Sequence, residues 1–113
     1  MIVIYHNPNC SKSRESLEIL ETSKEDIQII KYLDETLKVE KLRKIVKLLN
    51  IKPIELVRQD ETLWKENFQH LEFSDEELIE VMTNYPQLIE RPIVINGDKA
   101  VIGRPPTKIL DIL

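Results

Sequence analysis

The chain has 113 residues, the length of one ordinary domain, and 42% of them are hydrophobic, enough for one core. It carries 16 basic and 20 acidic residues, a formal net charge of -4, with no basic block, which argues against a nucleic-acid partner. No apolar run approaches the roughly 20 residues of a membrane-spanning helix. The amino-terminal residues are typical of a strand rather than a secretory signal. We therefore expect a soluble cytoplasmic monomer without a membrane partner.

The chain contains one cysteine, Cys10. A single thiol excludes an internal disulfide and a cysteine-rich zinc site. Any thiol–disulfide chemistry must take its second sulfur from another molecule. Because the sequence has no clustered metal ligands and no Gly-x-Gly-x-x-Gly loop, we expect neither a metal nor a bound organic cofactor.

The first third of the chain predicts a strand–helix–strand unit. Residues 2–5 are consecutive β-forming apolar residues, typical of a buried strand. The turn-forming segment 6–9 follows, and then good helix formers from residue 11 to about 21. Residues 27–32 predict a second strand. A strand–helix–strand unit favours a parallel crossover.

The middle of the chain predicts helices. Thr36 is a plausible N-cap for a helix that runs to about Asn50, with apolar positions at a spacing of three and four. Pro53 begins a short helical turn, and a weak helix covers about 63–68. A capping box begins a further helix and comprises Ser74, Asp75, Glu76 and Glu77. This helix should end at Tyr85-Pro86.

The end of the chain predicts a hairpin and a last helix. Residues 93–95 form an apolar strand, and Asn96-Gly97-Asp98 is a strong hairpin-turn signal. Residues 99–103 should return antiparallel. Proline suits the first turn of the final helix, which we expect from 105 to 113.

This order predicts an α/β, thioredoxin-like fold. Its mixed four-stranded sheet should combine the parallel unit with the antiparallel hairpin. A helical insertion, at about 36–85, separates the two halves. We expect residues 1–113 to form a single domain.

Cys10 stands where the first strand turns into the first helix. A helix N-terminus presents unpaired amides and partial positive charge, which stabilise a thiolate and attract an oxyanion. Arg14 lies one helical turn further on, and His6 ends the strand four residues earlier. The spacing predicts that both favour the Cys10 anion. The alternative is that Cys10 is a small buried hydrophobic residue and that His6 only bonds a loop carbonyl.

Three further arginines matter if they converge. Arg91 and Arg104 fall on the strands of one hairpin and should be near each other, whereas Arg58 lies in the insertion. Each taken alone would be a solvated charge. Pro92 would occupy the place where thioredoxin-like folds hold a cis proline against the active-site cysteine.

Four blocks together resemble the glutaredoxin-coupled arsenate reductase family. They are Tyr5-His6-Asn7-Pro8-Asn9-Cys10-Ser11-Lys12-Ser13-Arg14, Leu56-Val57-Arg58, Leu88-Ile89-Glu90-Arg91-Pro92-Ile93-Val94 and Gly103-Arg104-Pro105-Pro106. The resemblance covers essentially the whole chain, in order and with compatible spacing.

The resemblance implies a function and roles for these residues. Cys10 would be the nucleophile that reduces arsenate to arsenite, and Arg58, Arg91 and Arg104 would grip the oxyanion. Glutathione would be the co-substrate and glutaredoxin the protein partner, with arsenate or a similar oxyanion as substrate.

Related proteins give alternatives. Phosphatase-like arsenate reductases use Cys-x5-Arg and further cysteines, but Ser16 stands six residues after Cys10, so that route is excluded. A regulatory branch of the superfamily binds RNA polymerase, usually with a Cys-x-x-Cys switch. Ser13 prevents such a switch here, although polymerase binding does not itself require it. A general glutathione-dependent thiol reductase is the third alternative.

Overall fold

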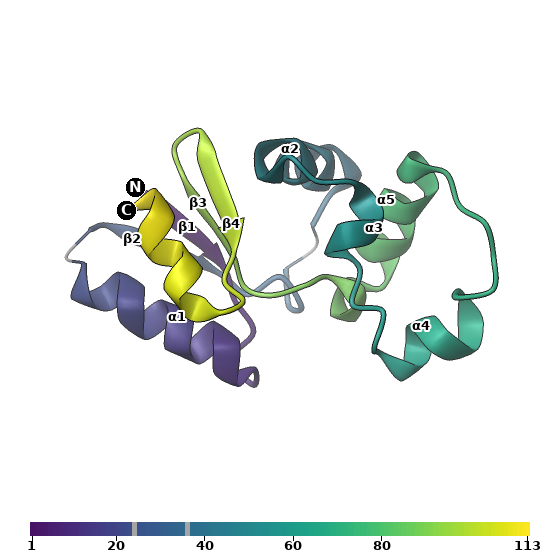
Figure 1. The fold of residues 1–113 in the computed structure, drawn as a ribbon, viewed down its shortest axis with the longest axis horizontal. Coiled ribbons are helices and arrows are strands. Elements are labelled where there is room, and N and C mark those ends of the chain that lie inside the picture. Colours follow the sequence, from purple (N-terminus) through teal and green to yellow (C-terminus); the bar gives the residue numbers. More distant parts are fainter. Residues whose placement is uncertain (24, 36) are drawn as a thin grey trace. The chain divides into compact units, whose positions relative to one another are not determined.

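The computed structural model describes residues 1–23, 25–35 and 37–113. They form four strands, five α-helices and two 3-10 helices (Figure 1). In chain order these are β1 (Ile2–Tyr5), α1 (Ser11–Thr22), β2 (Ile27–Ile30), α2 (Val39–Leu49), α3 (Pro53–Leu56), α4 (Thr62–Asn67), α5 (Asp75–Asn84), η1 (Pro86–Leu88), β3 (Ile93–Asn96), β4 (Lys99–Ile102) and η2 (Pro106–Ile112).

The chain divides into two compact units. The sheet unit comprises Met1–Glu35 and Arg91–Leu113, and the helical unit comprises Thr36–Glu90. The helical unit corresponds to the predicted insertion and extends five residues beyond the expected end. That the whole chain acts as a single domain stays a prediction.

The four strands form one mixed sheet in the order β2-β1-β3-β4. β1 pairs with β2 in parallel, and it pairs antiparallel with β3, which in turn pairs antiparallel with β4. The predicted parallel crossover and the predicted hairpin are both confirmed. Gly97 takes a positive φ of 65° in the hairpin turn, which glycine adopts at little cost.

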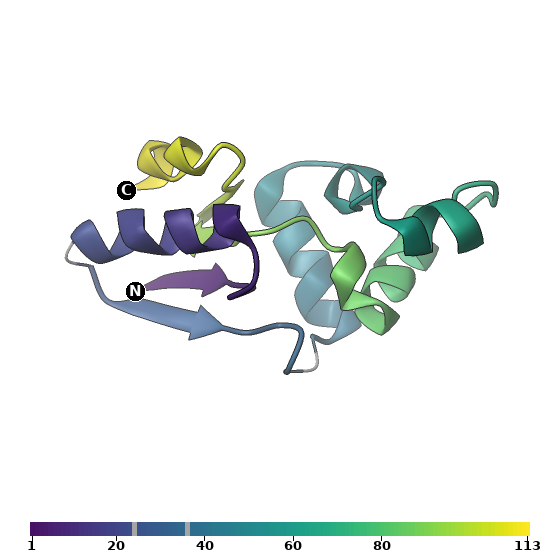
Figure 2. The same cartoon turned by 90° about the horizontal axis from the view of Figure 1, so that it is seen from below.

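One face of the sheet is covered by α1 and η2, which lie side by side (Figures 1 and 2). The core between them and the sheet is aliphatic. It consists of Ile2, Ile4, Leu20, Val94, Ile109 and Ile112, with Leu17, Ile19, Ile27 and Val101 packed against it. The helix that begins after Cys10 is therefore fixed to the sheet by apolar burial.

The helical unit contains α2 to α5 and η1. α2 and α3 both pack on α5. The predicted capping box of α5 is confirmed, because Ser74 Oγ accepts from the Glu77 amide at 3.2 Å and Glu77 Oε1 accepts from the Ser74 amide at 2.9 Å. An aromatic cluster adds to this unit, comprising Trp64, Phe68, Phe73 and Tyr85.

Several element boundaries differ from those expected. α2 begins at Val39, with Lys38 at the N-cap position, and the expected cap Thr36 lies outside the described residues. β2 ends at Ile30, two residues early. η1 was not predicted, although a proline at its start suits a short 3-10 turn. No helix in the described part of the chain is long and apolar enough to span a bilayer.

Candidate functional site

Cys10 occupies the N-cap position of α1. Its backbone is extended, with φ -101° and ψ 124°, and its carbonyl accepts the first helical bond from the Arg14 amide at 3.0 Å. The preceding turn is closed by Asn7, whose carbonyl accepts from the Cys10 amide at 3.0 Å and whose Oδ1 accepts from the Asn9 amide at 3.0 Å. This local geometry holds the half-buried thiol at the positive end of the α1 dipole.

The pKa of the Cys10 thiol is lowered from its ordinary value. Burial raises this pKa, but the amide of Ser13, the guanidinium of Arg91 and the amide of Lys12 together outweigh burial. The two amides belong to the first turn of α1, where backbone donors have no helical partner. Helix terminus and arginine thus both favour the thiolate, the nucleophilic form.

Arg104 completes the surroundings of the sulfur. Its Nη2 lies 3.5 Å from Cys10 Sγ, and its Nε donates to the Arg91 carbonyl at 2.8 Å. The carbonyl bond fixes the guanidinium plane. Arg91 and Arg104, predicted to be neighbours, are brought together with Cys10.

The backbone segments next to Arg91 and Arg104 are tightly packed against each other. The Arg91–Pro92 peptide is cis, as expected at this position, and the Arg104–Pro105 peptide is also cis. The amide of Gly103 donates to the Pro92 carbonyl at 2.9 Å. A Cβ on Gly103 would lie 2.7 Å from Ser16 Oγ and 2.9 Å from Pro92 Cγ, so only glycine fits without a shift.

His6 is buried and lies beside the first turn of α1. Its Nδ1 is 2.7 Å from Ser13 Oγ, which also accepts from the Asn7 amide at 2.9 Å. Burial lowers the pKa of His6, and the positive charges of Lys31 and Arg14 lower it further. A hydrogen bond with the Ser13 backbone opposes them only in part. A neutral imidazole follows near pH 7. His6 therefore positions the turn through Ser13 rather than adding a positive charge.

Arg14 is exposed and bonds to the loop before Cys10. Its Nη1 donates to the Pro8 carbonyl at 2.9 Å. This bond ties α1 to the turn that carries the cysteine. The positively charged groups beside the Cys10 sulfur are those of Arg91 and Arg104 instead.

Arg58 lies in the helical unit and is held by that unit's own groups. Its amide donates to the Leu88 carbonyl at 2.7 Å, and its Nε is 3.4 Å from Glu61 Oε1 and 4.0 Å from Glu90 Oε1. The Nε and Nη1 atoms are buried without a hydrogen bond. Arg58 therefore keeps buried donor atoms without a hydrogen bond, which is compatible with contact to an anion. The oxyanion-binding role of Arg58 stays a prediction.

Sequence reasoning assigned no role in the site to Ser13, Ser16 or Gly103. Ser13 could have been found from its spacing, since a side chain three residues into a helix faces back to the residues before it. Gly103 was less easily found. The chain has two glycines, and Gly103 is the one that does not belong to a predicted turn. Among the described residues, no three His, Cys, Asp or Glu side chains gather as a metal site.

Comparison with known proteins places the chain in a family. Residues 5–112 match the ArsC family. The chain belongs to the ArsC family. An arsenate reductase of Haemophilus influenzae is 46% identical over 99% of this chain and 98% of its own length. A Neisseria meningitidis arsenate reductase is 34% identical over 99% of this chain and 97% of its own length.

Solved structures of the ArsC family share the fold. An arsenate reductase from Vibrio cholerae superposes with a TM-score of 0.93 at 44% identity, covering 99% of this chain and 97% of its own. The predicted thioredoxin-like fold and the predicted family are both confirmed.

Proposed function

We propose that this ArsC-family chain reduces arsenate to arsenite through the Cys10 thiolate, with glutathione as co-substrate and glutaredoxin as the protein reductant. The observation that carries the proposal is the placement of the Arg91 and Arg104 guanidinium groups against a half-buried thiol of lowered pKa. The proposal is also supported by relatives that are named arsenate reductases and that are similar to this chain over 99% of its length.

The first step is attack of the Cys10 thiolate on arsenic(V). A sulfur–arsenic bond forms, and one arsenate oxygen leaves as water after protonation. Negative charge gathers on the remaining oxygens as the bond forms. Guanidinium groups already fixed beside the sulfur stabilise this charge without reorganising, which is the main source of such rate enhancement. Arg104 is held in this way by the Arg91 carbonyl.

The electrons come from two external thiols. A glutathione thiolate displaces a second oxygen as water and forms a new sulfur–arsenic bond. A glutaredoxin thiolate then attacks that glutathione sulfur. The sulfur–arsenic bond breaks with its electron pair left on arsenic, which becomes arsenic(III), and a mixed disulfide of glutathione and glutaredoxin departs. Water releases arsenite and returns the Cys10 thiol, so two thiols become one disulfide per arsenate.

The single cysteine agrees with this sequence of steps. Cys10 is the one thiol of the chain, so no internal disulfide can end the reaction. Both reducing sulfurs must therefore come from other molecules, as the proposed steps require.

Arg58 can be tested against a matched arginine in the same helical unit. Arg43 also bonds a carboxylate, that of Glu76, but on the exposed surface. If Arg58 contacts the oxyanion, Arg58→Gln should lower kcat/KM for arsenate at least about tenfold. Arg43→Gln should leave it unchanged. Equal activity of the two variants would remove Arg58 from the site.

A coupled assay tests the proposal itself. NADPH consumption is followed with glutathione, glutathione reductase and glutaredoxin, with and without arsenate. We expect consumption that requires arsenate, glutaredoxin and Cys10. Consumption that ignores arsenate would favour a general thiol reductase. No consumption, with capture of RNA polymerase by the purified protein, would favour the regulatory alternative.

A further inference from the structure

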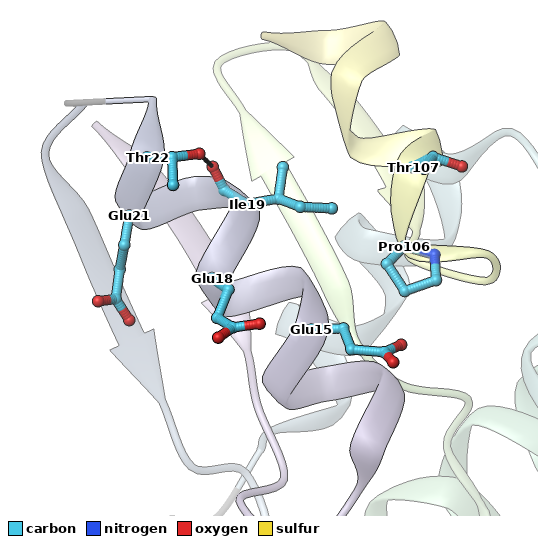
Figure 3. A pocket seen from close by; sticks show the side chains of 7 residues that line it. All are labelled: Glu15, Glu18, Ile19, Glu21, Thr22, Pro106 and Thr107. Carbon is cyan, nitrogen blue, oxygen red and sulfur yellow. Dashed lines mark hydrogen bonds between the residues drawn. The ribbon is translucent and has the colours of Figure 1, made fainter.

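A hollow of the sheet unit lies between α1 and η2. It has a volume of about 640 Å³ and is lined by Glu15, Glu18, Ile19, Glu21, Thr22, Pro106 and Thr107. Figure 3 shows Ile19 projecting from α1 toward η2 between the two helices, and the Glu15 carboxylate on the same side, near Pro106. We call this hollow the α1–η2 groove.

The floor of the α1–η2 groove is apolar. Ile19 and Pro106 supply hydrocarbon surface, and Ile19 also packs against the core. The Thr22 hydroxyl donates to the Ile19 carbonyl at 2.8 Å, so its hydrogen is already used (Figure 3). An apolar floor that stays open to water favours an apolar side chain from a partner.

The rim of the groove is acidic. Glu15, Glu18 and Glu21 repeat every three residues along α1 and are all exposed. Glu15 has an ion pair with Lys12 at 3.7 Å, whereas Glu18 and Glu21 have none with any described residue. Carboxylates spaced three residues apart on a helix repel one another.

The order of charges along α1 opposes its dipole. The first turn has no acidic residue and the last turn has no basic one. Carboxylates near a helix C-terminus are unfavourable, so Glu21, which lies in the last turn, does not complement the α1 dipole. Glu15, Glu18 and Glu21 together instead complement a positively charged ligand.

We propose that the α1–η2 groove is the docking site for the protein that delivers the reducing thiol. A basic segment of that protein would bind there and place one apolar side chain on the floor of the groove. This inference rests on the proposed function. The proposed steps require a protein thiol to reach an adduct on Cys10, the residue from which α1 begins. At 1.5 Å per residue, Glu15 to Glu21 lie roughly 8–17 Å along the helix from Cys10, within the footprint of a small protein.

A second copy of the chain is the competing occupant. α2 carries exposed Lys41, Lys44 and Lys47, which would complement the acidic rim. Such a contact would join two different surfaces, and head-to-tail contacts of this kind extend into open chains unless the rotation closes a ring. A separate reductant protein avoids this growth and is the occupant we assign.

Charge reversal at exposed positions tests the assignment. The variant Glu18→Lys/Glu21→Lys should raise the KM for glutaredoxin about tenfold while leaving the KM for arsenate unchanged. Added salt should raise the wild-type KM for glutaredoxin and have less effect on the variant. Asp98→Lys is the control, because it makes the same kind of change in the β3–β4 turn. An unchanged KM for glutaredoxin in the double variant would overturn the assignment.

A binding measurement separates this proposal from the proposed function. Cys10→Ser protein cannot react, so titration calorimetry with glutaredoxin reports docking alone. Binding that is lost on charge reversal supports the groove even if wild-type protein fails to reduce arsenate. Arsenate reduction with binding unaffected by charge reversal rejects the groove and retains the function. Wild-type self-association in sedimentation that the double variant abolishes would assign the groove to a second copy and overturn the proposal.

Discussion

Arg104 Nη2 lies 3.5 Å from Cys10 Sγ, although 94 residues separate the two in the chain. The Arg91 carbonyl holds Arg104 through its Nε, and the Arg91 side chain itself lowers the pKa of the thiol. Two residues from the β3–β4 half of the sheet unit thus act on a cysteine from the β1–α1 half. The sheet creates the site by placing these segments together.

The pH dependence of alkylation should report the lowered pKa of Cys10. We expect the iodoacetamide rate to reach half its maximum below the free-thiol value of about 8.5. Because folded protein releases this proton at lower pH than unfolded chain, Cys10 adds stability above the unfolded pKa, and this stability is lost as pH falls through the folded pKa. Arg91→Gln should move the midpoint up. A wild-type midpoint at or above the free-thiol value would contradict the site's electrostatics.

Arg91 and Arg104 should each be intolerant of lysine in catalysis. An ammonium group carries the charge but lacks the planar set of donors that fits an oxyanion. Arg91→Lys and Arg104→Lys should each lower arsenate turnover by about 10²–10³. Thermal unfolding should show whether the Arg104–Arg91 bond also contributes to stability. Near wild-type turnover in both variants would remove the arginines from the reaction.

Gly103 should not accept a side chain. Gly103→Ala places a Cβ against Ser16 Oγ and Pro92, and overpacking of this kind costs about 1–3 kcal/mol. Ser16 Oγ is buried without a hydrogen-bond partner, so Ser16→Ala should be well tolerated and should restore part of the loss in the double variant. Urea unfolding of the two single variants and the double variant measures the coupling. Strict additivity would show that the two residues do not meet.

His6 should make the protein less stable in acid. Its folded pKa lies below the ordinary 6.5, so the unfolded chain binds the proton more readily and stability rises with pH. The loss should therefore develop as pH falls below about 6.5. Urea unfolding at about pH 7.5 and about pH 5.5 should show a smaller pH effect in His6→Gln than in wild type. An equal effect in both proteins would mean that His6 does not titrate in this range.

Local signals predicted most of the fold. The Ser74 capping box, the Asn96-Gly97-Asp98 turn and the apolar run of β1 each depend on neighbours in sequence, and each is confirmed. Boundaries such as the start of α2 at Val39 were less predictable, because α2 is amphipathic and packs on α5, so tertiary contacts help to decide where it begins.

The sequence predicted which residues gather at the site, but it did not predict which way each side chain points. Cys10, Arg91 and Arg104 come together as the pattern indicated. Spacing alone suggested that Arg14 would turn toward the sulfur, but the Pro8 carbonyl is a competing acceptor that only the folded loop presents. The close approach of Gly103 to Ser16 likewise depends on the packing of two segments 87 residues apart in sequence and leaves no local pattern.

The central claim is that Cys10 reduces arsenate with two external thiols. Its most direct test is the stoichiometry of the products, with arsenite and oxidised glutathione measured in one reaction containing arsenate, glutathione and glutaredoxin. We expect one arsenite for each disulfide formed by the wild-type protein, and neither product above background with folded Cys10→Ser. Arsenite formed at the wild-type rate by Cys10→Ser, or disulfide formed by the wild type without arsenite, would contradict it.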